Sequence, residues 1–226
     1  MKKYIVALLL IQTVQLLNAA ADDEGLSVDI ACLSIKNGAD IDARDNFGHT
    51  RLFKAVLGYD EDLVQSLLAN GADVNARDVS GNTPLIAAIS AVYPDQNYYG
   101  VILELLIAKG ADINSQDNYG YTPLHQALSF RYLPCVLLLL EQENINIDLK
   151  SKYDERPIDC VLNSYFCWKK DDYLQILQAF AQRGAPLSDA SYQNDFDRLI
   201  EDGIITQEER ADIMSWVVED VKMAQD

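Results

Sequence analysis

One short segment occurs four times along this chain of 226 residues, at a spacing close to 33 residues. The two clearest copies are 78–85, DVSGNTPL, and 117–125, DNYGYTPLH. Two weaker copies are 45–52, DNFGHTRL, and 151–158, SKYDERPI. A unit of this length cannot bury an apolar face by itself. We therefore expect the copies to stack and to share one elongated core.

Each copy predicts a tight turn followed by a helix. Asp-x-x-Gly favours a turn, because Gly tolerates the positive φ that such turns use. Thr is a good helix N-cap, and Pro suits the first helical position, where its missing N–H would be unpaired anyway. Helices should therefore start at Thr83-Pro84 and at Thr122-Pro123.

A second helix is expected in each repeat, and it should end at a glycine in the left-handed region. Its apolar residues recur at i, i+1, i+4 and i+5, which is one face of a helix. Gly-Ala follows this stripe at Gly71, Gly110 and Gly184, and in the third copy Asn144 replaces the glycine and is expected to take the same backbone conformation. The apolar faces are Leu63, Val64, Leu67 and Leu68, and Ile102, Leu103, Leu106 and Ile107.

Thr-Pro-Leu occurs at 83–85 and again at 122–124, where His125 follows it. Together with the Gly-Ala endings in phase, this pattern resembles the ankyrin repeat over about residues 26–189. The resemblance implies an all-α ankyrin-repeat solenoid, in which each unit is a β-turn finger followed by two antiparallel helices. The expected organisation is a domain over 22–189, with a half repeat at about 26–44 and full repeats at about 45–77, 78–116, 117–150 and 151–189.

Residues 190–226 lack the repeat and predict a C-terminal helical cap, because repeat arrays need a terminal unit with a polar outer face. We expect a short helix over 195–200. Thr206 and Glu209 have the spacing of a capping box that opens a second helix. The alternative is that this acidic segment is a docking helix for a partner.

The N-terminus predicts a secretory signal peptide over 1–21. Lys2 and Lys3 precede an apolar run, and small residues end at Ala21. An uncleaved anchor is the alternative. The protein is therefore expected to be exported, to a bacterial periplasm or to the medium.

The formal net charge of −17 disfavours nucleic acid and anionic membranes as partners, since both are bound through Lys and Arg. The acidity either serves solubility alone or suits a basic partner. We expect a monomer that binds another protein and, once the signal peptide is removed, no membrane.

Catalytic chemistry has little support in the sequence. His49 and His125 are the only histidines, and no nucleotide-binding, hydrolase or metalloprotease motif accompanies them. In the ankyrin family the histidine at the position of His125 is structural, tying neighbouring turns together. The expectation is a protein that is not an enzyme, with no cofactor, no metal and no catalytic residue.

The cysteines, at 32, 135, 160 and 167, lack metal-site spacing. Cys160 and Cys167 are the only pair close in sequence, and on one continuous helix they would be about 10 Å apart along the axis, too far for a disulfide. Disulfides and free thiols both remain open.

The ankyrin resemblance implies that partners are held at the finger tips and on the exposed side of the first helices. Tips do not need aromatic residues for folding, so their aromatics are candidate anchors. Two insertions between the helices of a repeat are also rich in aromatics, which either bind a partner or cover the edge of the array. The candidate tip residues are Phe47, His49, Asn82, Tyr119, Tyr121 and Tyr153; the insertion residues are Tyr93, Tyr98, Tyr99, Tyr165, Phe166 and Trp168.

The sequence thus predicts a non-catalytic scaffold for protein–protein binding, by shape-matched docking on a rigid concave surface with aromatic anchors. One alternative is a secreted effector that binds host proteins. A less favoured one is an enzyme accessory with a site near the aromatic insertions.

Overall fold

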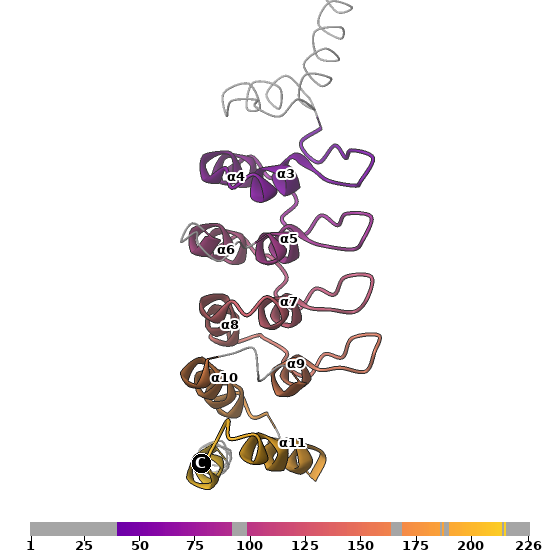
Figure 1. Cartoon of the computed structure of the whole chain (residues 1–226). Helices are drawn as coiled ribbons and strands as arrows, with labels where there is room; N and C mark the ends of the chain where they lie inside the picture. The colour runs from indigo at the N-terminus through magenta and orange to yellow at the C-terminus, as the bar shows by residue number, and fades with distance from the viewer. Residues whose placement is uncertain are drawn as a thin grey trace, which may run out of the picture. The chain divides into compact units, whose positions relative to one another are not determined.

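In a computed structural model of the chain, the described residues are helical or lie in turns and loops, and none of them forms a β-strand. Stacked helix pairs are followed by further helices toward the C-terminus, which confirms the all-α ankyrin-repeat fold class (Figure 1). The predicted signal peptide lies outside the described residues, and so does most of the predicted half repeat. The structure describes residues 40–91, 99–163, 169–185, 187, 190–213 and 215.

The chain divides into two compact units. The first contains the described residues up to Ala88 together with Val101–Ala111, and the second contains Ile89–Gly100 and the residues from Asp112 onward. Two repeats fall mainly in the first unit and two in the second.

In the first unit, α3 (Arg51–Leu57) packs against α4 (Glu61–Ala69). The next repeat supplies α5 (Pro84–Ser90) and α6 (Tyr99–Ala108). Figure 1 shows the loops that precede α3 and α5 projecting to the same side of the helix pairs.

The predicted helix signals act as expected in this unit. The Thr50 hydroxyl accepts a hydrogen bond from the Phe53 amide at 3.2 Å. In the next repeat, α5 begins at Pro84 as predicted. After the second helices, Gly71 and Gly110 have φ of 89° and 88°, the left-handed conformation that ends a helix.

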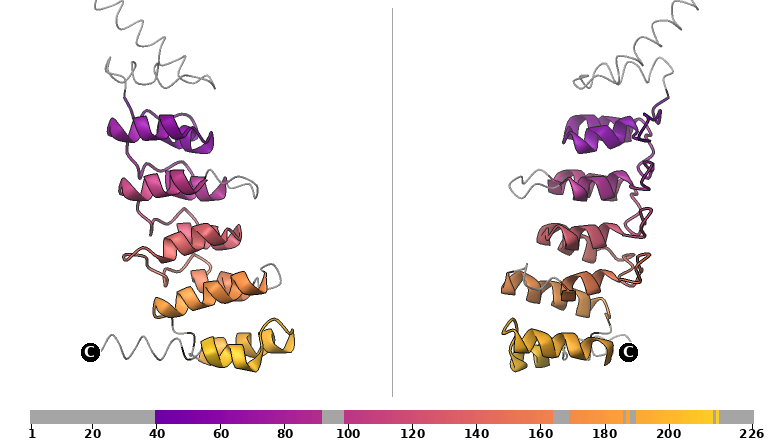
Figure 2. Two further views of the ribbon diagram at one scale, coloured as in Figure 1. Left: turned by 90° about the vertical axis from the view of Figure 1, so that its left-hand side faces the viewer. Right: turned by 45° about the vertical axis from the view of Figure 1, so that its right-hand side comes forward.

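In the second unit, α7 (Pro123–Ser129) packs against both α8 (Leu133–Leu140) and α9 (Pro157–Asn163), and α8 packs against α10 (Lys170–Gln182). Figure 2 shows these helices from two further directions. The buried core of the unit is made by the apolar faces of these helices. Its largest fully buried side chains are those of Tyr173, Phe180, Tyr192 and Phe196.

Two repeats join their helices by a short turn at a non-glycine residue with positive φ. Tyr59 has a φ of 57° between α3 and α4, and Arg131 has a φ of 57° between α7 and α8. The other two repeats carry the insertions at the corresponding place. Residues 92–98 and 164–168 of these insertions lie outside the described residues.

The prediction for Asn144 is wrong. The non-glycine positive-φ residues in the described part of the chain are Tyr59, Arg131 and Asp154, so Asn144 is not left-handed. The physical reason is that α8 ends at Leu140, with Glu141 as its C-cap, and the loop that follows has a different path. The Asn144 carbonyl nevertheless accepts from Asn114 Nδ2 at 2.8 Å, the role that the Gly110 carbonyl has toward Asn75 at 3.1 Å.

Side-chain contacts join the C-terminal helices to the last repeat. Helix α11 (Ala190–Glu201) is longer than the predicted 195–200, because Tyr192 and Phe196 lie one turn apart and are both buried. Residues 207–213 are also helical. The capping box is confirmed, since Thr206 N donates to Glu209 Oε2 at 2.7 Å and Glu209 N donates to Thr206 Oγ1 at 3.1 Å. Lys170 Nζ, on α10, lies 2.9 Å from Glu209 Oε1.

Candidate protein-interaction surface

The finger tips are four five-residue turns that share one hydrogen-bond pattern. In the first, Asp45 Oδ1 accepts from the amides of Phe47 and His49, both at 2.9 Å. The Asp45 amide donates to the His49 carbonyl at 3.1 Å, and the Gly48 amide donates to the Asp45 carbonyl at 3.0 Å. We number the fingers in chain order: finger 1 is 45–49, finger 2 is 78–82, finger 3 is 117–121 and finger 4 is 151–155.

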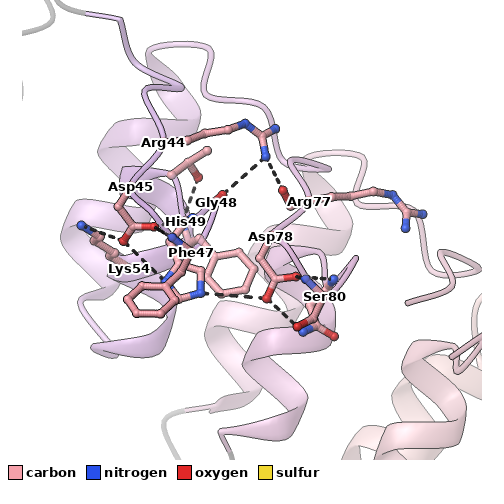
Figure 3. A network of polar contacts seen from close by, with 12 residues as sticks. Arg44, Asp45, Phe47, Gly48, His49, Lys54, Arg77, Asp78 and Ser80 are labelled. Carbon is pink, nitrogen blue, oxygen red and sulfur yellow. Dashed lines mark hydrogen bonds and ion pairs between the residues drawn. The ribbon is translucent and has the colours of Figure 1, made fainter. Parts of the chain in front are cut away.

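Electrostatics help to hold finger 1. Desolvation alone would raise the pKa of Asp45. The hydrogen bond from the His49 amide, the contact with Lys54 and the bond from the Phe47 amide outweigh that effect, so the pKa of Asp45 is lowered. Lys54 Nζ lies 3.2 Å from Asp45 Oδ2 (Figure 3). The carboxylate therefore stays ionised and keeps accepting both amides.

Finger 4 makes the same turn from different residues. Ser151 Oγ replaces the carboxylate and accepts from the amides of Tyr153 at 3.2 Å and Glu155 at 3.4 Å. Asp154 occupies the position of the glycine, with a φ of 64°, close to the 83° of Gly120 in finger 3. The most degraded copy of the repeat therefore preserves the geometry of the others.

Backbone hydrogen bonds join adjacent fingers within each unit. The Val79 amide of finger 2 donates to the Phe47 carbonyl of finger 1 at 3.0 Å. In the second unit, the Lys152 amide of finger 4 donates to the Tyr119 carbonyl of finger 3 at 2.8 Å. Such bonds fix the spacing between neighbouring tips.

Side chains at the base of the fingers reinforce this spacing. Arg44 donates from one guanidinium nitrogen to the carbonyl of Gly48, in finger 1, and to that of Arg77, which directly precedes finger 2 (Figure 3). In the second unit Gln116 Nε2 donates to the carbonyls of Gly120 at 2.7 Å and Lys150 at 3.0 Å. Arginine and glutamine thus perform one structural role at equivalent positions.

The third residue of fingers 1, 3 and 4 is an exposed aromatic. Phe47 is 65% exposed, Tyr119 56% and Tyr153 61%. Their main chains are held by the turn and by the bonds between fingers, while their rings extend into solvent. These three candidate tip residues therefore combine a fixed backbone with an accessible ring.

The other predicted tip residues are more involved in the fold. Tyr121 is partly buried, with its ring edge-on to His125 at 5.5 Å and its hydroxyl donating to Glu155 Oε2 at 3.4 Å. Asn82 Nδ2 donates to Asp78 Oδ2 at 3.0 Å and so supports its own turn.

His49 also has several contacts within the fold. Its ring lies parallel to that of Phe53, with centroids 4.5 Å apart, and 5.8 Å from that of Phe47. Nδ1 lies 3.7 Å from Asp45 Oδ2, and Nε2 lies 3.9 Å from Asp78 Oδ2 (Figure 3). The imidazole therefore fills the space between fingers 1 and 2.

His125 has the structural role that the family resemblance implies. It is fully buried, Nδ1 accepts from the Thr122 amide at 3.1 Å, and Nε2 lies 3.0 Å from the Glu155 carbonyl of the next finger. Because Nδ1 accepts, Nε2 carries the proton and donates to that carbonyl. Burial lowers the pKa of His125, although its hydrogen bond to the Glu155 carbonyl and the nearby negative charges oppose that effect.

The insertion residues are only partly placed by the structure. Tyr99 begins α6, but its side chain is outside the described residues. The other five also lie outside the described residues: Tyr93, Tyr98, Tyr165, Phe166 and Trp168.

Neither described cysteine has a lowered pKa. Burial raises the pKa of Cys135 to about 12. The pKa of Cys160 is raised to about 11, by burial first and then by Glu155 and Asp159. Cys160 lies on α9, which ends at Asn163, and Cys167 is outside the described residues.

Two kinds of feature are absent from the described part of the chain. No group of three or more His, Cys, Asp or Glu side chains gathers there in a way that could hold a metal ion. No helix there is both long enough and apolar enough to cross a membrane.

Several exposed apolar side chains were not among the candidate residues selected from the sequence. Val79 on finger 2 is 64% exposed, Phe130 at the end of α7 49%, Val101 on α6 45% and Leu57 at the end of α3 39%. Alignment of the repeats gives a signal for Phe130, which stands where the first repeat has Gly58. Only Val79 lies on a finger.

A family model for ankyrin repeats, in three copies, matches residues 16–117 and 96–152. The matched residues span more than half of the chain, so this protein belongs to the ankyrin-repeat family. Ankyrin repeats are typically protein–protein interaction modules, and no catalytic domain was detected. No curated protein matches the chain. The matched residues end inside finger 4, yet α9 and α10 follow that finger as a further helix pair.

Proposed function

We propose that this protein is an exported, monomeric, non-catalytic scaffold that holds another protein at its finger tips. The observation that carries the proposal is the exposure of Phe47, Tyr119 and Tyr153 on fingers with fixed backbones. Large rings with few degrees of freedom are the residues that most often dominate binding energy at interfaces. Because the turns and the bonds between fingers already order the main chain, binding needs to order little more than the rings.

The proposal makes the three exposed rings more important than the other tip residues. Tyr121, His49 and Asn82 contribute to the fold, so their removal would confuse loss of binding with loss of structure. Truncation of the exposed rings leaves the bonds of each turn intact, because these bonds use only main-chain atoms and the side chains of Asp45, Asp117 and Ser151.

The test is a pull-down with the full chain and a Phe47→Ala/Tyr119→Ala/Tyr153→Ala variant. The matched control is Leu57→Ala/Val101→Ala/Phe130→Ala, which removes three exposed apolar side chains that are not on fingers. We expect partners captured by the wild type to be lost with the first variant and kept with the control. Circular dichroism establishes that both variants are folded. If the first variant keeps every partner, the finger tips are not the binding surface.

Export is a separate part of the proposal and rests on the N-terminal pattern at 1–21. In a bacterial host, mass spectrometry of the fractionated protein should give a mature N-terminus at Asp22, in the periplasm or the medium. A full-length protein that begins at Met1 would contradict cleavage. Recovery from the cytosol of a host cell would favour the effector alternative over a periplasmic scaffold.

A further inference from the structure

Fingers 3 and 4 place the rings of Tyr121 and Tyr153 close to a carboxylate, and Tyr119 is a further exposed tyrosine on finger 3. The Tyr121 and Tyr153 ring centroids are 6.1 Å apart. The Tyr119 carbonyl, on finger 3, accepts a hydrogen bond from the Lys152 amide of finger 4. Tyr153 and Tyr119 are mostly exposed, so their ring faces are open to solvent. The Glu155 carboxylate lies at this cluster, because Tyr121 Oη donates to its Oε2 at 3.4 Å. We call Tyr119, Tyr121, Tyr153 and Glu155 the tyrosine cluster.

The tyrosine cluster has a negative electrostatic environment. Burial raises the pKa of Tyr121, and the negative charge of Glu155 raises it further. The ammonium group of Lys150, which directly precedes finger 4, is paired with another carboxylate, since its Nζ lies 2.8 Å from Asp154 Oδ1. Exposed ring faces next to a carboxylate suit a cation that is flat and can donate hydrogen bonds, which describes guanidinium better than ammonium.

The same chain already contains an arrangement of this kind. The guanidinium carbon of Arg156 lies 4.9 Å from the centroid of the Tyr192 ring. On the same side chain, Arg156 Nε lies 3.5 Å from Asp159 Oδ2. An arginine held between a tyrosine face and a carboxylate is therefore a geometry that this chain uses where the last repeat meets α11.

We infer that the tyrosine cluster binds an arginine side chain from a basic segment of the partner protein. The inference rests on the proposed function and gives its chemistry. The net charge of −17 would attract a basic segment over a longer range, and the cluster would then select arginine from it.

The test uses the full chain, with its tyrosine rings labelled for NMR, and a panel of synthetic Gly-Ser peptides. The peptides carry two arginines, two lysines, two citrullines or two glutamates at the same positions. We expect the arginine peptide to shift the ring resonances of Tyr153 and to bind about two- to fivefold more tightly than the lysine peptide, the range of one exposed cation–π contact. The citrulline and glutamate peptides should leave the ring resonances unchanged.

Variants distinguish specific binding of arginine at the tyrosine cluster from general attraction of a basic peptide to an acidic protein. Glu155→Gln should weaken the arginine peptide about two- to fivefold, the upper range for an exposed ion pair. Asp154→Asn removes the same charge from the same finger, but its carboxylate pairs with Lys150, so its effect should be smaller. Tyr153→Ala should lose the peptide, whereas Tyr153→Phe, which keeps the ring, should retain it. Lys152→Ala should strengthen binding, because it removes a like charge from the tip.

Equal effects of Glu155→Gln and Asp154→Asn, or equal affinity for arginine and lysine peptides, would overturn the inference in favour of general charge attraction. Binding of the glutamate peptide, weakened by Lys152→Ala, would overturn it in favour of an acidic partner. The proposed function fails separately, when the Phe47/Tyr119/Tyr153 variant keeps every partner in the pull-down.

Discussion

Gly120→Ala tests whether close approach of adjacent fingers, and not only backbone conformation, requires glycine at the finger tips. Gly120 has a φ of +83°, and a Cβ added there would lie 2.9 Å from Lys152 N and 3.1 Å from both Ser151 C and Ser151 Cα. These are backbone atoms of the next finger, so they cannot rotate away as a side chain would. The substitution must therefore displace finger 4 relative to finger 3.

The expected loss in the free energy of unfolding of Gly120→Ala has two parts. Alanine in the left-handed region costs about 1 kcal/mol relative to glycine. Displacement of finger 4 strains or breaks the bond from the Lys152 amide to the Tyr119 carbonyl, which contributes about 1 kcal/mol when formed. Together these predict a loss of about 2 kcal/mol in the free energy of unfolding.

Gly184→Ala is the matched control. Gly184 belongs to the same unit and has a φ of +76°, but no heavy atom lies within 4 Å of the Cβ that would be added. It should therefore lose only the conformational part, about 1 kcal/mol. Urea unfolding followed by circular dichroism compares the two variants.

A second measurement locates the effect. Because repeat arrays can unfold in parts, hydrogen exchange of the Lys152 amide should report on the finger contact directly. We expect faster exchange in Gly120→Ala and no change in Gly184→Ala. Equal losses of stability in the two variants, with unchanged exchange at Lys152, would refute the role of finger contact.

Three further predictions concern the helices and a buried histidine. Arg131→Gly should raise the free energy of unfolding by about 1 kcal/mol in urea unfolding, because glycine adopts the φ of 57° without strain. His125 has a folded-state pKa below its ordinary 6.5, so its contribution to stability is complete above pH 6.5 and is lost as the pH falls below it. The free energy of unfolding should therefore fall on acidification from pH 7 toward 5, with a shallower slope in His125→Asn. Thr206→Ala should lose about 1 kcal/mol by removing a helix cap, with a smaller loss in Thr206→Ser.

The fold was predictable because its signals are local and repeated. Thr83-Pro84 and Thr122-Pro123 each encode a helix start that needs no knowledge of distant residues. The capping box at Thr206 is equally local. Asn144 was not predictable in the same way, because the end of α8 at Leu140 depends on how the following loop continues. Asn or Gly predicts a left-handed conformation only when it directly follows the last turn of a helix, and Asn144 lies beyond the end of α8.

The candidate surface was predictable in position but not in detail. Alignment placed Phe47, Tyr119 and Tyr153 on tips, and their exposure agrees with that placement. The same alignment could not separate them from Tyr121, because the partial burial of that ring depends on His125 and on Glu155 of the next finger. Contacts between neighbouring repeats depend on the folded structure, so they cannot be read from the sequence of one copy of the repeat.

Finger 4 has Asp154 at the position where the other fingers have glycine, and this difference has a physical reason. A Cβ at Gly48 would lie 3.0 Å from Val79 N of the next finger, just as one at Gly120 would meet Lys152. Asp154 has the same left-handed backbone but carries a Cβ, and its side chain is 82% exposed. After α10 the described chain continues into α11, and no further finger follows finger 4 among the described residues. The loss of glycine at this position is therefore tolerated, because no finger among the described residues needs the space beside Asp154. It follows that Asp154→Ala should cost far less stability than Gly120→Ala, although both place alanine at a positive φ.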